Sequence, residues 1–350
     1  MLLLLPQKPA NSIQIHYWFG DESHTMDALV QNRCEYEFLG ILKEIASSFN
    51  AEIIIETEPL TDGGLRRWFK IISKEENKKG TITTTIIVAL ATTLIITPLG
   101  KIPEKLIDKI FEDKELLEIE KDGKKLQNEK LRLEIEELKQ KSQRNTELLN
   151  HNNVIRKKKS NFYEALEKYP KVNEVSFNVA SDDKVILSED KKVTRNNFKQ
   201  YILVSDDLAP VEIDNAVIEI ISPVLKKGNY KWMGIYNGES VPFNMKSKEF
   251  KTLVQTGEIK FVNGTSINCF LVVRKKIDNE GLEKIVGYDV LRVNNYFEND
   301  KPIETPEGKY HRQKKEAEQR SCEVTTIQSI FKMSSFFANK LDKSIIFALQ

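Results

Sequence analysis

The stretch Thr81–Gly100, TITTTIIVALATTLIITPLG, dominates the interpretation of this sequence, because it runs for twenty residues without a charge between Lys79 and Lys101. A helix rises about 1.5 Å per residue, so these residues would span roughly 30 Å, the thickness of the hydrocarbon core of a bilayer. Lysines at both ends suit the headgroup layers. We therefore expect a transmembrane helix over residues 80–100.

Seven of these twenty residues are threonine. The spacing of Thr81, Thr85, Val88 and Thr92 places them on one face of a helix. In an associated bundle such a face packs helices together, forms interhelical hydrogen bonds or lines water. These four residues are our candidates for a pore-lining or helix-packing face.

Two other interpretations of this stretch stay open. Threonine and isoleucine favour strands, so residues 82–97 also fit one or two buried strands between Gly80 and Pro98. Alternatively, the threonine hydroxyls bond back to carbonyl groups of their own helix, which would make the polar face incidental.

Charge and cysteine content narrow the classes of protein. The 350 residues carry 30% charged side chains but a net charge of only +1, so the chain lacks the basic excess of a dedicated nucleic-acid binder, although a local basic patch remains possible. Three distant cysteines suggest neither a disulfide framework nor a zinc site, and we expect no metal and no cofactor. The leading MLLLL run is broken by Pro6 and has no basic n-region, so we do not expect it to act as a signal peptide. With six basic residues before the apolar stretch and four after it, we expect a single-pass inner-membrane protein with a cytoplasmic N-terminal domain.

Residues 1–79 read as a small α/β domain. Residues 12–19 predict a strand, residues 25–49 an amphipathic helix and residues 51–56 a second strand. His24, Asp27 and Glu56 lie near the ends of these elements, where they would form an acid/base pair or a metal site. Ordinary helix capping explains the first two residues better, so we assign no catalytic residue.

Residues 101–160 predict a long oligomerising helix. Apolar residues recur at heptad spacing, which favours a coiled coil and a homo-oligomer: Ile110, Leu117, Leu131 and Leu138. A solvated amphipathic helix packed on its own chain is the alternative. The region ends in a basic cluster that suits either an anionic ligand or simple solvation of a helix end: Arg156, Lys157, Lys158 and Lys159.

Residues 161–300 predict an antiparallel β domain. Asn237-Gly238 and Asn263-Gly264 each separate two β-rich runs and predict type I′ hairpins, and a third hairpin is expected around residues 278–281. Aromatic residues of this region are expected in its core rather than in base stacking: Trp232, Tyr236, Phe243 and Phe261. Residues 301–350 form a polar, basic tail with a possible helix from residue 324.

The sequence contains no GxxxxGK[ST], GxGxxG after a strand, HExxH, GxSxG or paired CxxC, and no internal repeat is visible. The common nucleotide-hydrolysing, dehydrogenase, zinc-protease and serine-hydrolase classes therefore have no local support.

Several segments together resemble bacterial proteins of antiphage (antiviral) defence: Ser23–Ala28, Gly63-Gly64-Leu65, the Thr/Ile-rich stretch, and Lys231-Trp232 followed by Asn237-Gly238-Glu239. The chain is similar to the membrane effector of Hailong-type systems. That resemblance implies an oligomeric ion channel controlled by a nucleotide ligand, an oligonucleotide made by a partner nucleotidyltransferase.

We therefore expect an α+β protein with an N-terminal α/β unit, one transmembrane helix, a long coiled-coil-like helix and a C-terminal antiparallel β domain. Its expected function is that of a homo-oligomeric membrane effector that forms a ligand-gated or partner-gated pore. A single-pass receptor or scaffold without a pore is one alternative. A membrane-tethered hydrolase that uses His24, Asp27 and Glu56 is the other.

Overall fold

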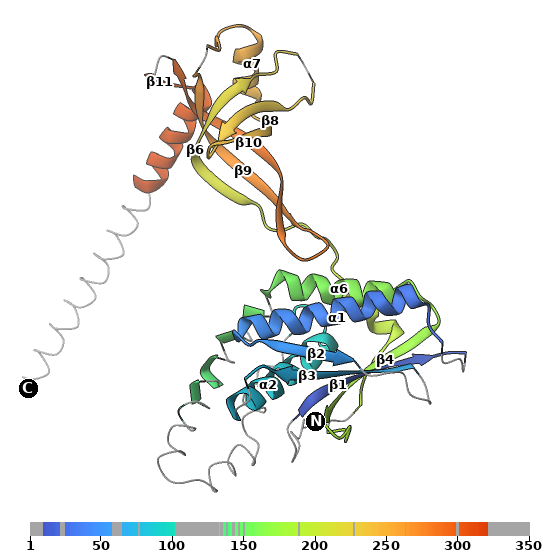
Figure 1. Ribbon diagram of the computed structural model, residues 1–350. Helices are drawn as coiled ribbons and strands as arrows, with labels where there is room; N and C mark the ends of the chain where they lie inside the picture. Colours follow the sequence, from blue (N-terminus) through green and yellow to red (C-terminus); the bar gives the residue numbers. More distant parts are fainter. Residues whose placement is uncertain are drawn as a thin grey trace, which may run out of the picture. The chain divides into compact units, whose positions relative to one another are not determined.

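The computed structural model divides into two compact units, each with its own sheet (Figure 1). Unit 1 comprises Met1–Asp207 and Ile277–Lys284, and unit 2 comprises Leu208–Lys276 and Ile285–Gln350. Apart from some residues between 133 and 149, the structure describes residues 10–21, 25–57, 65–75, 78–101, 151–187, 190–226, 228–262, 264–298 and 301–320.

Unit 1 has a five-stranded sheet in the order β2-β3-β1-β4-β5, in which every neighbouring pair is antiparallel. Its strands are β1 (Ala10–Phe19), β2 (Ile53–Thr57), β3 (Leu65–Ser73), β4 (Val172–Ser181) and β5 (Lys191–Thr194). Its helices are α1 (Ala28–Ser48), α2 (Lys78–Ile96), α6 (Asn153–Glu167) and the short 3-10 helix η1 (Arg195–Tyr201). The chain order is β1-α1-β2-β3-α2-α6-β4, and β1 lies between β3 and β4; apart from the additional helix α2, this is the split β-α-β arrangement. The predicted strand, helix and strand at the N-terminus are confirmed as β1, α1 and β2.

Helices α1 and α6 pack against each other and cover the apolar face of this sheet. The ring of Phe38 on α1 lies 5.7 Å from Phe69 of β3 and 5.9 Å from Phe177 of β4. Phe162 of α6 lies 5.8 Å from the same Phe177. These aromatic contacts join both helices to the central strands in one core.

The prediction of a transmembrane helix over residues 80–100 is wrong. These residues form α2, which packs against β1, β3, β4 and α1, and Ile87, Leu90 and Ile95 are fully buried in the core of unit 1. A helix enclosed on all sides is apolar all round, as a membrane helix is, and this explains the error. Within the described residues, no helix combines the length and the apolar character that crossing a membrane requires. The predictions of an inner-membrane location and of an ion channel depended on that helix and are wrong as well.

Side chains of unit 1 also donate hydrogen bonds to the carbonyl oxygens at the C-terminal end of α2. Lys159 Nζ donates to the carbonyl oxygens of Leu94 and Thr97, while Tyr163 and Tyr201 donate to those of Ile95 and Ile96. The last carbonyl groups of a helix lack partners within the helix, so a buried helix end needs such donors. The end of α2 is thus built into unit 1.

The fold-class prediction is also wrong in its long coiled-coil helix, since no such helix is present among the described residues. Helix α6 begins afresh at Asn153, after Asn152, whose extended backbone and side-chain hydrogen bond to Ile155 N mark a helix start. A continuous helix through residue 160 is therefore interrupted at Asn152.

Unit 2 is a closed five-stranded barrel, formed by β6, β7, β8, β10 and β9 in that order, with β9 pairing again to β6. The elements are β6 (Val211–Ser222), β7 (Trp232–Tyr236), β8 (Glu239–Met245), α7 (Lys248–Gln255), β9 (Ser266–Ile277), β10 (Glu283–Glu298) and β11 (Lys301–Glu304). Strand β8 runs parallel to β10, and α7 connects β8 to β9. This topology is that of an OB-fold, a small Greek-key barrel.

Two of the three predicted hairpins are confirmed. Asn237 and Gly238 join β7 to β8 with φ of 50° and 82°, the two positive values that a type I′ turn requires. Residues 278–281 join β9 to β10. The hairpin expected at residues 263–264 is wrong, because residues 258–262 lead from α7 into β9 without forming a strand. Trp232 and Phe243 are fully buried in the barrel, as predicted.

Candidate functional site

The threonine face of α2 is used inside its own helix. Thr85 Oγ1 donates to Thr81 O at 3.1 Å, and Thr92 Oγ1 donates to Val88 O at 2.8 Å. Val88 and Thr92 are buried in unit 1. The structure therefore matches the alternative in which the hydroxyls bond back to their own helix.

Of the three residues considered for catalysis, the structure describes Asp27 and Glu56. Asp27 is the N-cap of α1, where its carboxylate accepts hydrogen bonds from Leu29 N and Val30 N at 2.8 and 3.1 Å. Glu56 lies on β2 opposite Lys70, and His24 is outside the described residues. In the described part of the chain, no group of three or more His, Cys, Asp or Glu side chains is placed to hold a metal ion.

The lysines of the basic cluster lie within α6 and have partners in unit 1. Lys157 pairs with Asp206 at 2.7 Å, and Lys158 pairs with Glu280 at 2.7 Å. Burial, reinforced by the charge of Arg156, lowers the pKa of Lys159 to about 8. The ammonium groups of Lys157, Lys158 and Lys159 already have partners within the fold and are not available to bind an anionic ligand.

The four candidates for oligomerisation, Ile110, Leu117, Leu131 and Leu138, lie outside the described residues. Self-association through them stays a prediction.

The sheet face of unit 1 opposite α1 and α6 carries polar side chains, of which Gln14, His16, Ser176 and Asn178 are buried, together with Trp18 and Trp68, which are half-buried. Alternate residues of β1 point to the two faces of the sheet, so Ile13, Ile15 and Tyr17 enter the core while their neighbours face the other way. The strand registers align these neighbours in cross-strand rows, because directly opposed residues share a face. We call this the polar sheet face, formed by Gln14, His16, Trp18, Arg66, Trp68, Lys70, Ser176, Asn178 and Lys192.

Two rows cross the centre of this face. One runs from Asn178 on β4 through Gln14 on β1 to Trp68 on β3. The other contains one residue from each of four adjacent strands: Lys192, Ser176, His16 and Arg66. Aromatic, amide and cationic side chains therefore alternate across the two central strands.

Trp18 is held in place by three neighbours. Its Nε1 donates to Ser176 Oγ at 3.1 Å, its ring lies 4.0 Å from that of His16, and Lys192 Nζ sits 3.7 Å from its ring centroid. A cation this close to an indole face is attracted by the ring quadrupole. Trp68, in contrast, is half-buried, and no contact with another aromatic ring is found for it among the described residues. Trp68 is thus the ring best placed to accept a stacking partner.

One buried polar atom on this face lacks a partner. Asn178 is only 5% exposed, and its Nδ2 donates to Gln14 Oε1 at 3.1 Å. Its Oδ1 receives no hydrogen bond from the described residues. A buried acceptor left open in this way costs free energy, and a bound donor would satisfy it.

The cations of this face are Arg66, Lys70 and Lys192, and two carboxylates lie on the same side of the sheet: Glu56, opposite Lys70, and Glu174, opposite Trp18. Arg66 is exposed, and the Lys70 and Lys192 side chains keep 34% and 40% of their surface. Lys70 pairs with Asp182 at 2.6 Å, and Lys192 lies 3.6 Å from Glu174. The ammonium groups remain within reach of solvent, where they attract an anion.

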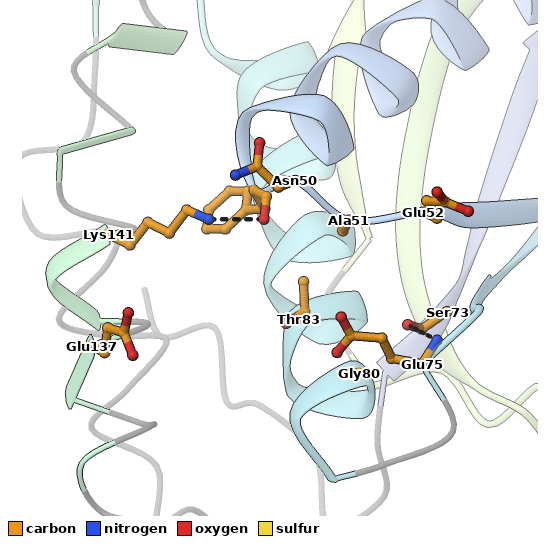
Figure 2. Close-up of a pocket in the computed structure, with 10 residues that line it drawn as sticks. Asn50, Ala51, Glu52, Ser73, Glu75, Gly80, Thr83, Glu137 and Lys141 are labelled. Carbon is orange, nitrogen blue, oxygen red and sulfur yellow. Dashed lines mark hydrogen bonds between the residues drawn. The ribbon is translucent and has the colours of Figure 1, made fainter.

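A recess of about 220 Å³ in unit 1 lies between the end of α1, the end of β3 and the start of α2 (Figure 2). Glu52, Glu75 and Glu137 line it, and Lys141 donates to the Phe49 carbonyl at 2.8 Å. Glu52 is already paired with Lys74 at 2.8 Å. Its acidic lining gives an anionic ligand little to bind.

Unit 2 has an open groove with an apolar rim. Ile221, Leu225 and Val262 are more than half exposed there, beside Glu219 and Lys260. Nothing in the described structure indicates what covers these residues. The outer face of β7 and β8 carries Met233, Ile235, Ser240 and Pro242 and has no aromatic ring for stacking.

The polar sheet face was missed in the sequence, although a signal for it is present. In residues 12–19 the polar residues Gln14 and His16 alternate with Ile13, Ile15 and Tyr17, which predicts a strand with one non-apolar face. Strand β3, LRRWFKIIS, repeats the pattern with Arg66, Trp68 and Lys70. That β1 and β3 lie side by side is a property of the fold, and residue spacing does not reveal it.

Comparison of this chain with known protein families, with curated proteins and with solved structures finds no match.

Proposed function

We propose that this protein binds a short single-stranded oligonucleotide on the polar sheet face of unit 1. The observation that carries the proposal is the placement of two half-buried rings on adjacent strands, Trp18 on β1 and Trp68 on β3, with Arg66, Lys70 and Lys192 near them. Aromatic rings on a positively charged surface are the usual means by which proteins hold unpaired bases.

Each kind of side chain on this face suits one part of a nucleotide. Trp68 offers a ring face to a base, and stacking of this kind contributes about 1–3 kcal/mol per base. Arg66, Lys70 and Lys192 suit the phosphates. The open Asn178 Oδ1 and its neighbour Gln14 suit the hydrogen-bonding edge of a base.

The geometry favours a single strand over a duplex. A flat sheet presents rings to the faces of bases, and in a duplex those faces are hidden by stacking within the helix. Four strands contribute to the polar sheet face, and the comparable aromatic positions of RNA-recognition sheets stack about two or three bases. We therefore expect a short binding site.

Two further considerations support the proposal. The split β-α-β sheet with rings on its two central strands is the arrangement used by RNA-recognition motifs, which is an analogy at the level of fold. On separate grounds, the resemblance noted in the sequence implies an oligonucleotide ligand. The channel output that the same resemblance implies is not part of the proposal.

Fluorescence anisotropy with labelled eight-nucleotide strands of mixed sequence, DNA and RNA, tests this function. We expect both single strands to bind more tightly than a duplex of the same sequence, and Trp68→Ala to weaken binding about tenfold or more. Tyr310→Ala is the matched control, because Tyr310 is a 71% exposed ring in unit 2. Absence of binding to either single strand, or equal losses in the two variants, would refute the proposal.

A further inference from the structure

The turn between β9 and β10 is held on helices α1 and α6, and its residues are part of unit 1. The Asp278 carboxylate accepts hydrogen bonds from Glu280 N and Leu282 N, both at 2.9 Å, so the turn is ordered by its own contacts. Gly281 has a φ of 85°, and a Cβ there would come within 2.4 Å of Val154 Cα. The turn therefore sits directly against the start of α6. We call residues 278–282 the strap.

Three polar side chains hold the strap. Lys158 Nζ binds Glu280 Oε2 at 2.7 Å, and Tyr36 donates to the same oxygen at 2.9 Å. Asn161 Nδ2 donates to the Asn279 carbonyl at 3.0 Å. Lys158 Nζ also lies 4.6 Å from the centroid of the Tyr36 ring.

A buried carboxylate lies beneath these contacts. Glu37 is fully buried, and it pairs with Arg33 at 2.7 Å and with Lys158 at 3.5 Å. Asn161 also donates to Glu37 Oε1 at 3.2 Å. Lys158 is thus shared between Glu37, which belongs to α1, and Glu280, which belongs to the strap.

Because Lys158 is shared in this way, detaching the strap from α1 and α6 requires little free energy. A buried lysine that loses its only counter-charge is strongly destabilised, but Lys158 keeps Glu37 when Glu280 leaves. Little apolar surface holds the strap, since Leu282 is 59% exposed. Ile277, which precedes the strap, is only 6% exposed and stays as an anchor.

We infer that the strap is a releasable element that detaches from α1 and α6 without unfolding unit 1, with Lys158 as its latch. The strap lies between two of the points at which the chain passes from one unit to the other, 276/277 and 284/285. This inference is independent of oligonucleotide binding.

Hydrogen–deuterium exchange of the full chain tests the inference. In Glu280→Gln we expect exchange in a peptide covering residues 277–284 to rise about tenfold, because a charge-assisted hydrogen bond is lost. Peptides from α1 and α6 should exchange at the wild-type rate. Glu280 is 47% exposed, so this variant does not disturb the core.

Lys168→Met is the matched control, because Lys168 follows α6 and forms an exposed pair with Glu164. It should leave exchange at residues 277–284 unchanged. Two results would overturn the inference: unchanged exchange at residues 277–284 in Glu280→Gln, or an increase that extends through α1 and α6 and so shows the strap opening only with the whole unit.

Discussion

At the scale of residues, α2 shows how the same side chains serve different environments. Leu90 is fully buried, in the core that α2 shares with the sheet and α1. The Thr85 hydroxyl bonds to a carbonyl oxygen of its own helix. A long apolar side chain is therefore critical to this helix, whereas its threonine hydroxyls contribute little.

This contrast predicts opposite outcomes for two substitutions in α2. Leu90→Arg places an unpaired charge in the core and should unfold unit 1, because burying such a charge exceeds the usual stability of a domain. Thr85→Val keeps the volume and loses only a second bond to one carbonyl oxygen, so it should change the free energy of unfolding by no more than about 1 kcal/mol. Urea denaturation followed by circular dichroism measures both. A folded Leu90→Arg protein would show that α2 is not a core helix.

A second prediction at the scale of residues compares the stability effects of substituting two glycines of the β7–β8 hairpin, Gly238 and Gly234. Gly238 has a φ of 82° with open space around it, so Gly238→Ala should cost about 1–2 kcal/mol of unfolding free energy through backbone strain alone. A Cβ on Gly234 would lie 2.6 Å from Ile218 Cγ2 and 2.7 Å from the Glu219 carbonyl oxygen. Gly234→Ala should therefore cost more than Gly238→Ala in thermal denaturation, and the reverse order would contradict the barrel packing.

At the scale of elements, the sequence predicts the helices, strands and turns that are determined by residue patterns within their own segments. Alternation in residues 12–19, the helical period of residues 25–49 and the Asn237-Gly238 turn each correspond to an element in the structure. The nature of α2 is not local, because an apolar helix looks the same whether protein or lipid surrounds it. Strand β3 was not predicted, and without it Trp68 has no known neighbour.

The strap gives a prediction for pH. Hydrogen bonds from Lys158 and then Tyr36 lower the pKa of Glu280 below its usual value. Docking therefore favours ionised Glu280, so its contribution is complete above the usual carboxyl pKa of about 4.3 and is lost as the pH falls below it. Arg33 and Glu37 also face this site. Burial raises the pKa of Glu37, and docked Glu280 raises it further, so protonation of Glu37 opposes release.

Exchange of residues 277–284, corrected for the intrinsic rate at each pH, measures this effect. In the wild-type protein, protection should stay constant from about pH 7 to about pH 5 and should fall as the pH is lowered further to about 3. In Glu280→Gln it should be low throughout and should not fall further. A decrease of the same size in both proteins would assign the pH dependence to a group other than Glu280.

At the scale of the whole molecule, a net charge of +1 means that electrostatic attraction of an oligonucleotide depends on local charge. Three cations lie on the polar sheet face: Arg66, Lys70 and Lys192. If each contacts one phosphate, the logarithm of the association constant should fall with the logarithm of salt concentration with a slope of about −2. Lys192→Ala should make the slope shallower by about 0.7. Lys168→Ala should leave it unchanged, and a wild-type slope near zero would exclude phosphate contacts.

The most direct test of the central claim is the position of a bound strand on the protein. Photocrosslinking of the full chain to a single strand that carries 5-iodouracil, followed by mass spectrometry, identifies the side chains that stack on bases. Binding on the polar sheet face predicts crosslinks in peptides that contain Trp68 of β3 or Trp18 of β1, with loss of the first in Trp68→Ala. Crosslinks confined to unit 2, or to the α1 and α6 side of unit 1, would contradict the account.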